Sequence, residues 1–174
     1  CIMLDSLVRM EWLTVRRSGV LMHITSLPSP GGVGTLGKDA YAFLDFMADA
    51  GLRVWQMLPI GPTGYGESPY QSGSTHAGNP MLIDLELLRE EGLLDADLPQ
   101  PGGDPARVDF PTVRAQKTRL LRASFEQSFA KVEAQVRAFV KEQDWPPEDG
   151  RAVNWLDAYA LYAAVKEACG GEMW

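Results

Sequence analysis

Two apolar runs joined by one amphipathic stretch set the strongest limit on what this chain can fold into. Residues 19–24 and 52–60 are mostly apolar, as expected of strands that are covered on both faces. Residues 38–50 predict a helix, and Gly51 follows as its stop. One side of this helix is apolar and carries Tyr41, Leu44, Met47 and Ala48. Strand, helix and strand within about 40 residues predict a right-handed βαβ unit with parallel strands.

Each of the two predicted strands is followed by a long loop. Residues 25–37 are rich in Ser, Pro and Gly, and residues 61–80 combine Gly and Pro with two tyrosines. Loops of this length without secondary structure of their own are uncommon in compact domains and are usually functional. We therefore look for binding residues in these two segments.

The rest of the chain is predicted to be mostly helical. Residues 81–85 indicate a third short strand, and residues 95–107 are typical of a linker. Residues 112–143 predict a long amphipathic helix, and Asn154 is placed to cap a last helix that runs to Cys169. The apolar stripe of the long helix consists of Leu121, Phe125, Phe129, Val132, Val136 and Val140.

Charge and composition exclude several classes of function. The 174 residues include 23 acidic and 16 basic side chains, and the formal net charge of −7 disfavours nucleic acid as a partner. No apolar run reaches the roughly 20 residues of a membrane helix. Cys1 and Cys169 show neither metal-ligand spacing nor a disulfide framework, so we expect a reduced, cytoplasmic protein. The densest basic run is expected to form a solvated helix face: Arg114, Lys117, Arg119 and Arg122.

Residues 32–37 match G-x-G-x-x-G, the glycine pattern of dinucleotide sites. Such sites need a tight turn after the first strand and an acidic residue about 20 positions later. Here residues 26–30 intervene, and residues 57–60 (MLPI) end the second strand without an acid. We favour a loop with positive φ at one or more glycines. A nucleotide-dependent enzyme remains an alternative, which a nicotinamide titration would test.

The spacing of the histidines and serines does not indicate a hydrolase triad or a metal site. His23 and His76 lack a metal-binding spacing, and Ser26 and Ser68 lack a nucleophile-elbow context. We expect no metal and no cofactor. Glycosidic chemistry needs two carboxylates on either side of one bond, and the sequence alone does not place any two of its acids that way. The acids considered are Asp39, Asp45, Asp49, Glu67, Asp84 and Glu86.

Residues 64–72 (GYGESPYQS) form the most suggestive binding segment. Two tyrosine rings among small residues are suited to the apolar face of a sugar, with hydroxyl and amide groups nearby for its hydroxyls. A structural turn whose tyrosines fill neighbouring grooves fits the composition equally well.

Three stretches together resemble the opening of amylomaltases, the disproportionating enzymes of glycoside hydrolase family 77. They are residues 23–29 (HITSLPS), 54–72 (VWQMLPIGPTGYGESPYQS) and 77–85 (AGNPMLIDL). The likeness extends over residues 18–94 and returns in residues 155–161 (WLDAYAL). It implies the N-terminal part of a (β/α)8 TIM barrel with an inserted helical subdomain, whose site lies at the C-terminal ends of the strands.

The resemblance also implies a function. It indicates a 4-α-glucanotransferase that moves α-1,4-glucan segments between maltooligosaccharides or starch- and glycogen-derived glucans by a retaining mechanism. The three catalytic carboxylates of the family lie on later strands, so no catalytic residue is assigned here. Tyr70 and Ser68 match positions on the donor side of the cleft, and Tyr65 matches an outlying glucan site. His76 departs from the family, which usually has Phe there.

These expectations divide the chain into three segments. Residues 1–15 are expected to be an N-terminal extension or added segment, residues 16–94 the first βα units with substrate-facing loops, and residues 95–174 a helical inserted subdomain cut short at its C-terminus. A free-standing glucan-binding module without catalysis is the alternative from a different class.

Overall fold

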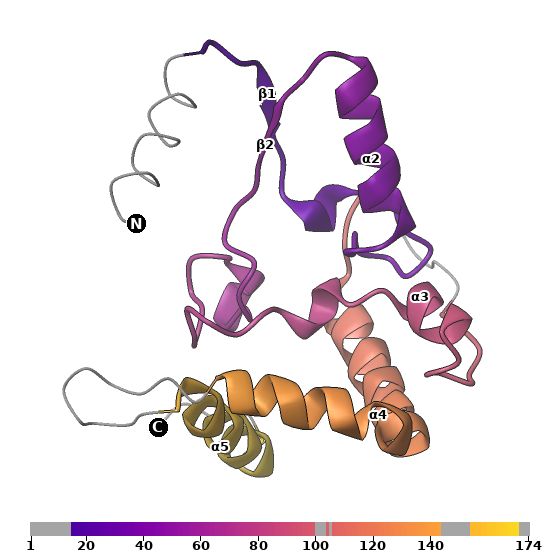
Figure 1. Cartoon of the computed structure of the whole chain (residues 1–174), viewed down its shortest axis with the longest axis vertical. Helices are drawn as coiled ribbons and strands as arrows, with labels where there is room; N and C mark the ends of the chain where they lie inside the picture. The colour runs from indigo at the N-terminus through magenta and orange to yellow at the C-terminus, as the bar shows by residue number, and fades with distance from the viewer. Residues whose placement is uncertain (1–14, 100–103, 105, 144–153, 171–174) are drawn as a thin grey trace, which may run out of the picture.

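A computed structural model describes residues 15–99, 104, 106–143 and 154–170 (Figure 1). The expected extension before residue 15, Cys1 and the residues after 170 lie outside this described part. Two strands and four helices follow one another along the described chain: β1 (Gly19–Leu21), α2 (Lys38–Asp49), β2 (Val54–Gln56), α3 (Leu85–Glu90), α4 (Phe110–Glu142) and α5 (Trp155–Ala168). Three short 3-10 turns lie between them: η1 (Ile24–Ser26), η2 (Tyr65–Glu67) and η3 (Pro80–Leu82).

The βαβ unit expected from the sequence is confirmed. β1 and β2 pair in parallel, with Gly19 opposite Val54 and Leu21 opposite Gln56, and α2 forms the connection between them. The indole nitrogen of Trp55 donates to the Met22 carbonyl at 2.8 Å, which ties the two segments together just beyond the paired residues. The two strands and α2 lie at one end of the molecule in Figure 1.

The expected strands are shorter and more exposed than predicted. Each has three residues, and Leu21 is 63% exposed. The prediction of which side of α2 is buried is also partly wrong. Ala40 and Met47 are buried, whereas Tyr41 and Leu44 are exposed. An apolar run shows that its residues favour burial, but burial also needs a partner. Within the described residues the sheet has only two strands, so parts of both runs stay exposed.

The prediction of a strand over residues 81–85 is wrong. η3 occupies part of this run, with Pro80 at its first position and the Asn79 side chain accepting from Met81 N. Asp84 then caps α3 by accepting from Leu87 N at 2.9 Å. Two side-chain caps within six residues favour turns and a helix start over extended backbone. The apolar residues of the run are nevertheless core residues, since Met81 and Leu82 are buried.

The long helix occurs almost as predicted, but a different face of it is buried. α4 begins at Phe110 after its cap Asp109, while the ending expected at residues 145–147 (WPP) lies outside the described residues. From the predicted apolar stripe, Phe125 is 60% exposed, and Val136 and Val140 are exposed as well. The buried face instead carries Val113, Lys117, Leu120, Ser124 and Ser128.

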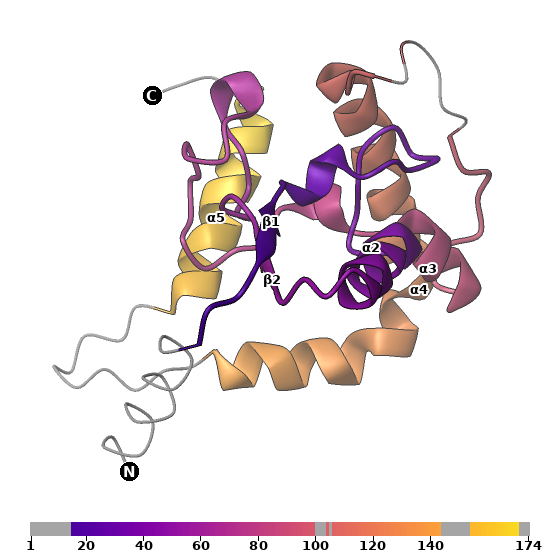
Figure 2. The same ribbon diagram turned by 90° about the horizontal axis from the view of Figure 1, so that it is seen from above.

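Two small serine side chains and their hydroxyl groups explain how α4 packs. Ser124 donates to the Leu93 carbonyl at 2.8 Å, and Ser128 donates to the Ser124 carbonyl one turn earlier at 2.6 Å. A serine bond back to the preceding turn bends helices. The two halves of α4 run in clearly different directions in Figure 2. The N-terminal half packs on the core, whereas the C-terminal half leads toward α5.

Three small apolar clusters form the described core. One joins η1, α2 and η3, a second joins the glycine loop to the start of α4, and a third joins α3 to α4. Their buried members are Ile24, Leu27, Ala40 and Leu82; Val33, Met81 and Val113; and Leu85, Leu94 and Leu120.

No helix in the described part of the chain is long and apolar enough to cross a membrane.

The glycines of residues 32–37 serve close backbone packing. Gly32 has φ +77°, which confirms the expected positive φ. A Cβ on Gly34 would lie 2.0 Å from the Ile24 carbonyl oxygen, and one on Gly37 would lie 1.9 Å from a carboxylate oxygen of Asp84. Both distances are far below van der Waals contact, so any side chain at these positions must displace its neighbour.

We expect Gly34→Ala to destabilise the protein by about 1–3 kcal/mol, because the methyl group meets rigid backbone. Urea unfolding followed by tryptophan fluorescence measures the change. Gly31→Ala is the matched control, since its Cβ would have no neighbour closer than 3.8 Å. Equal stability of the two variants would contradict this account of the glycine loop.

Candidate functional site

The segment between β2 and η3 lies against both α4 and α5. Its residue Gly73 approaches the ring of Tyr162 on α5, to which an added Cβ would lie at 3.5 Å. His76 packs on Trp155 at the start of α5, with ring centroids 5.5 Å apart. The loop and α5 lie side by side in Figure 2. The predicted binding segment is therefore supported by helices that come much later in the sequence.

Residues 63–72 form a small hairpin whose loop carries Tyr70. Thr63 and Ser72 form an antiparallel bridge, and Gly64 N donates to the Gln71 carbonyl at 3.1 Å. Gln71 N donates to the Ser68 carbonyl at 3.0 Å, which closes a tight turn with Pro69 and Tyr70 at its corners. Proline is favoured at the first corner of such a turn.

The positions of Ser68 and Tyr70 bear on the interpretation of the loop as a purely structural turn. Ser68 is extended, with φ −69° and ψ 124°, a conformation that proline favours in the residue before it. The side chain of Tyr70 is 73% exposed, so in the described part of the chain it does not fill a neighbouring groove. An exposed ring on a short, hydrogen-bonded turn can contact a ligand with little loss of conformational entropy.

Tyr65 occupies a different part of the loop from Tyr70. It begins η2, directly after Gly64, and Gly66 inside that turn has φ 73°. The structure thus places Tyr65 in a 3-10 turn and Tyr70 in the tight turn that follows it, within the same hairpin loop.

An ion pair connects the loop to α4. One terminal nitrogen of Arg114 donates to both carboxylate oxygens of Glu67, at 2.6 and 2.5 Å. The Thr63 hydroxyl donates to Glu67 at 2.6 Å and accepts from Arg114 at 3.3 Å. Burial raises the pKa of Glu67, but the hydrogen bonds from Arg114 and Thr63 and the guanidinium charge outweigh it and lower that pKa.

This pair was not visible in the sequence. Arg114 belongs to the basic run expected to be solvated, and the same expectation is wrong for Lys117, which is buried. Arg119 and Arg122 do lie on the exposed surface. The only local sign was an acid between Gly66 and Ser68, in a loop otherwise without charge.

His76, where the family resemblance implies Phe, makes an aromatic contact. Its ring lies at 32° to that of Trp155, and the Trp155 indole donates to Gln143 at 3.1 Å. The imidazole therefore joins the loop to α5 by ring packing, as a phenyl ring could.

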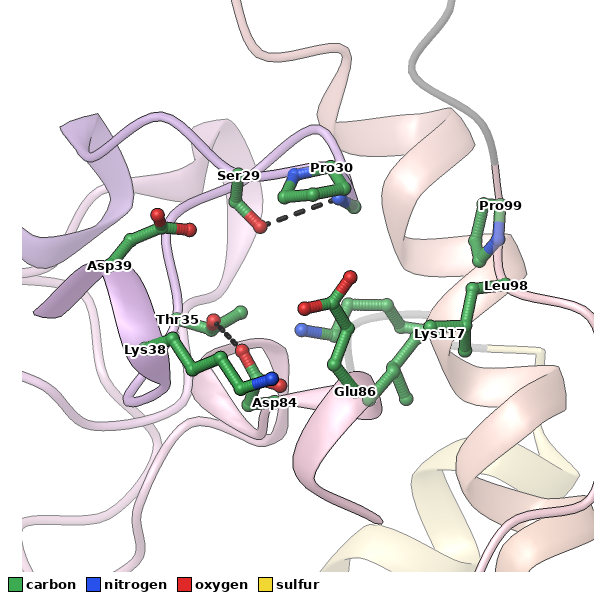
Figure 3. A pocket seen from close by; sticks show the side chains of 12 residues that line it. Ser29, Pro30, Thr35, Lys38, Asp39, Asp84, Glu86, Leu98, Pro99 and Lys117 are labelled. Atoms are coloured by element: carbon green, nitrogen blue, oxygen red, sulfur yellow. Dashed lines mark hydrogen bonds between the residues drawn. The ribbon is translucent and has the colours of Figure 1, made fainter. Parts of the chain in front are cut away.

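A second group of polar residues surrounds a small cavity between the glycine loop, α3 and α4 (Figure 3). Its volume of about 30 Å³ suits roughly one water molecule and not a sugar. Asp84 accepts from Thr35 at 2.6 Å as well as from Leu87 N, and Lys38 pairs with Glu90. These groups hold the structure together, so the cavity is not the substrate site.

None of the described residues forms a group of three or more His, Cys, Asp or Glu side chains that could hold a metal ion. The thiol of Cys169 is free and exposed.

Comparison with known proteins assigns the family. The 4-alpha-glucanotransferase family model matches residues 22–174, which is most of the chain. The chain belongs to the 4-alpha-glucanotransferase family. A 4-alpha-glucanotransferase of Thermus thermophilus is 45% identical over 163 residues, which cover 91% of this chain and 30% of the relative. One from Synechocystis is 43% identical over 164 residues, covering 93% and 32%.

Solved structures agree with the sequence relatives. The amylomaltase of Streptococcus agalactiae in complex with acarbose superposes with a TM-score of 0.80 at 36% identity, over 91% of this chain and 31% of that one. The chain thus spans about a third of the length of these family members. The family resemblance noted in the sequence is confirmed, and so is a mixed α/β fold with a parallel βαβ unit.

Proposed function

We propose that this chain forms the N-terminal part of an enzyme that transfers α-1,4-glucan segments between maltooligosaccharides. The observation that carries the proposal is the family match over residues 22–174. It is supported by the superposition on an amylomaltase that holds acarbose. Glucans derived from starch or glycogen are the proposed substrates, and the cytoplasm is the proposed compartment.

In this proposal β1, α2 and β2 supply the first units of a (β/α)8 barrel. Residues 16–94 carry these units with their loops, and residues 95–174 carry the inserted helical subdomain, to which α4 and α5 belong. The parallel pairing of β1 and β2 supports the assignment, since every strand of such a barrel is parallel to its neighbours. The hairpin at residues 63–72 follows the second strand, where loops of the C-terminal face are expected.

Within the loop we assign donor contacts to Tyr70 and Ser68 and an outlying glucan contact to Tyr65. The exposure of Tyr70 on the tight turn of the hairpin supports the first assignment. The retaining chemistry requires two carboxyl groups about 5–5.5 Å apart. Because the family resemblance implies catalytic carboxylates on later strands, we place the nucleophile and the acid outside this chain. Glu67 and Asp84 are engaged in structural bonds.

The test compares two proteins on maltotriose. We expect the full-length gene product that contains these residues to release glucose and longer oligomers, and the 174-residue chain alone to release neither. Turnover that follows the short chain through purification would overturn the placement of the carboxylates. Amylose binding by the full-length protein without turnover would favour a glucan-binding module instead.

A further inference from the structure

Glu67 has an unusual backbone conformation within the hairpin loop. Glu67 has a φ of 56° and is the one non-glycine residue with positive φ among the described residues. It follows Gly66, which has a φ of 73°. Positive φ is unfavourable for a residue with a Cβ and persists only where the surroundings enforce it. The neighbourhood of Glu67 should therefore contain the group that enforces this conformation.

Arg114 is that group. Its guanidinium and the Thr63 hydroxyl together bind both oxygens of the Glu67 carboxylate. Among the ion pairs of the described residues this one is the least exposed, with 43% of the Arg114 and 21% of the Glu67 side chain accessible. The pairs Lys38–Glu90, Arg122–Glu167 and Arg137–Glu133 are all more exposed. A partly buried, charge-assisted pair holds geometry better than an exposed one.

The backbone at Glu67 determines where Tyr70 lies. Ser68 comes next in the chain, and its carbonyl closes the turn that carries Tyr70 by accepting from Gln71 N. A rotation at Glu67 therefore moves the whole turn relative to α4. Displacements of about 1 Å at a substrate-positioning group are enough to slow a reaction about a hundredfold.

We propose that Arg114 is a positioning residue, which holds Glu67 in its left-handed conformation from α4 and so fixes Tyr70 at the glucan donor. This role rests on the proposed function, and it assigns to the helical segment after residue 95 a part in substrate binding. Arg114 itself is not proposed to touch the glucan.

The first test uses Arg114→Met in the full-length gene product. We expect kcat/KM on maltotriose to fall about tenfold, and the amide hydrogens of Gly64 and Gln71, which close the hairpin, to exchange faster. Arg137→Met is the matched control, because Arg137 pairs with Glu133 within the same helix, and it should change neither quantity. Unchanged turnover and exchange in Arg114→Met would overturn the inference. A wild-type enzyme without turnover would overturn the proposed function instead.

A double mutant separates positioning from a general structural role. If Arg114 acts through Tyr70, the Arg114→Met, Tyr70→Ala double variant should be no slower than Tyr70→Ala alone. Losses that multiply would contradict the proposal. Should Arg114→Met fail to fold, Glu67→Ala and Glu67→Gly give the same answer. Both lose the ion pair, but only glycine adopts positive φ freely, so the glycine variant should keep several-fold more activity. Equal losses would again overturn the inference.

Discussion

Tyr70→Ala is expected to lower turnover on maltotriose and on amylose at least tenfold in the full-length gene product. The ring is 73% exposed, so its loss should leave the melting temperature unchanged. An aromatic contact contributes about 0.5–1.5 kcal/mol beyond area burial. A misplaced donor also slows the chemical step, which adds to the loss. Steady-state rates on the two substrates measure the effect.

Two companion variants make the Tyr70 experiment specific. Tyr70→Phe keeps the ring and should retain most of the activity if stacking dominates. Tyr65→Ala removes the other tyrosine of the loop and should weaken long-glucan binding by roughly tenfold or less, with maltotriose turnover unaffected. Equal losses for Tyr65→Ala and Tyr70→Ala on both substrates would show that the proposed division of labour is wrong.

Local signals in this sequence were reliable wherever they act within a few residues. Asn154 accepts from Leu156 N and caps α5 as expected, and Gly51 ends α2 at φ 73°. Pro69 disfavours helical backbone at the residue before it, and Ser68 is extended. Caps and proline restrict the backbone directly, so their effects survive whatever the chain packs against.

Signals that depend on a packing partner were less reliable. The stripe through Phe125 identified a helix correctly but not the face that is buried. Ser124 lies on the buried face and donates to the Leu93 carbonyl. The run at residues 81–85 marked buried residues but not their backbone, because the caps at Asn79 and Asp84 favour turns. Periodicity reports which residues are apolar, whereas the choice of face depends on contacts far along the chain.

The ion pair of the binding loop shows the same limit at the site. The tyrosines were found from composition, whereas Arg114 lies 47 residues beyond its partner Glu67. Nothing in a basic helical run distinguishes the arginine that reaches a loop from those that face water. The tertiary contact alone makes that distinction, and the same holds for Lys117.

Lys117→Met is expected to destabilise the protein by about 2–4 kcal/mol at neutral pH. Lys117 is 2% exposed, and its ammonium donates to the carbonyls of Met81 and Ile83, at 2.6 Å each. Methionine fills similar space but leaves both oxygens without their donor, and each unsatisfied buried group costs about 1–3 kcal/mol. Urea unfolding of both proteins gives the difference. Lys131→Met is the matched control, because Lys131 donates to the Gly92 carbonyl from an exposed position, and we expect it to change stability by less than about 0.5 kcal/mol.

The stability difference between wild type and Lys117→Met should also depend on pH. Burial lowers the pKa of Lys117 from 10.5 to about 8, although the charge of Asp84 acts in the opposite direction. Below pH 8 both states hold the proton, and the fold bears the cost of a buried charge. Between pH 8 and 10.5 the folded state has released a proton that the unfolded state still binds, so wild type gains stability as pH rises. The gain is at most about 3 kcal/mol and is reduced by the two carbonyl acceptors, which favour the ammonium form. We therefore expect the deficit of Lys117→Met to be larger at pH 10 than at pH 7, and a deficit that stays constant or shrinks would show that Lys117 remains charged in the fold.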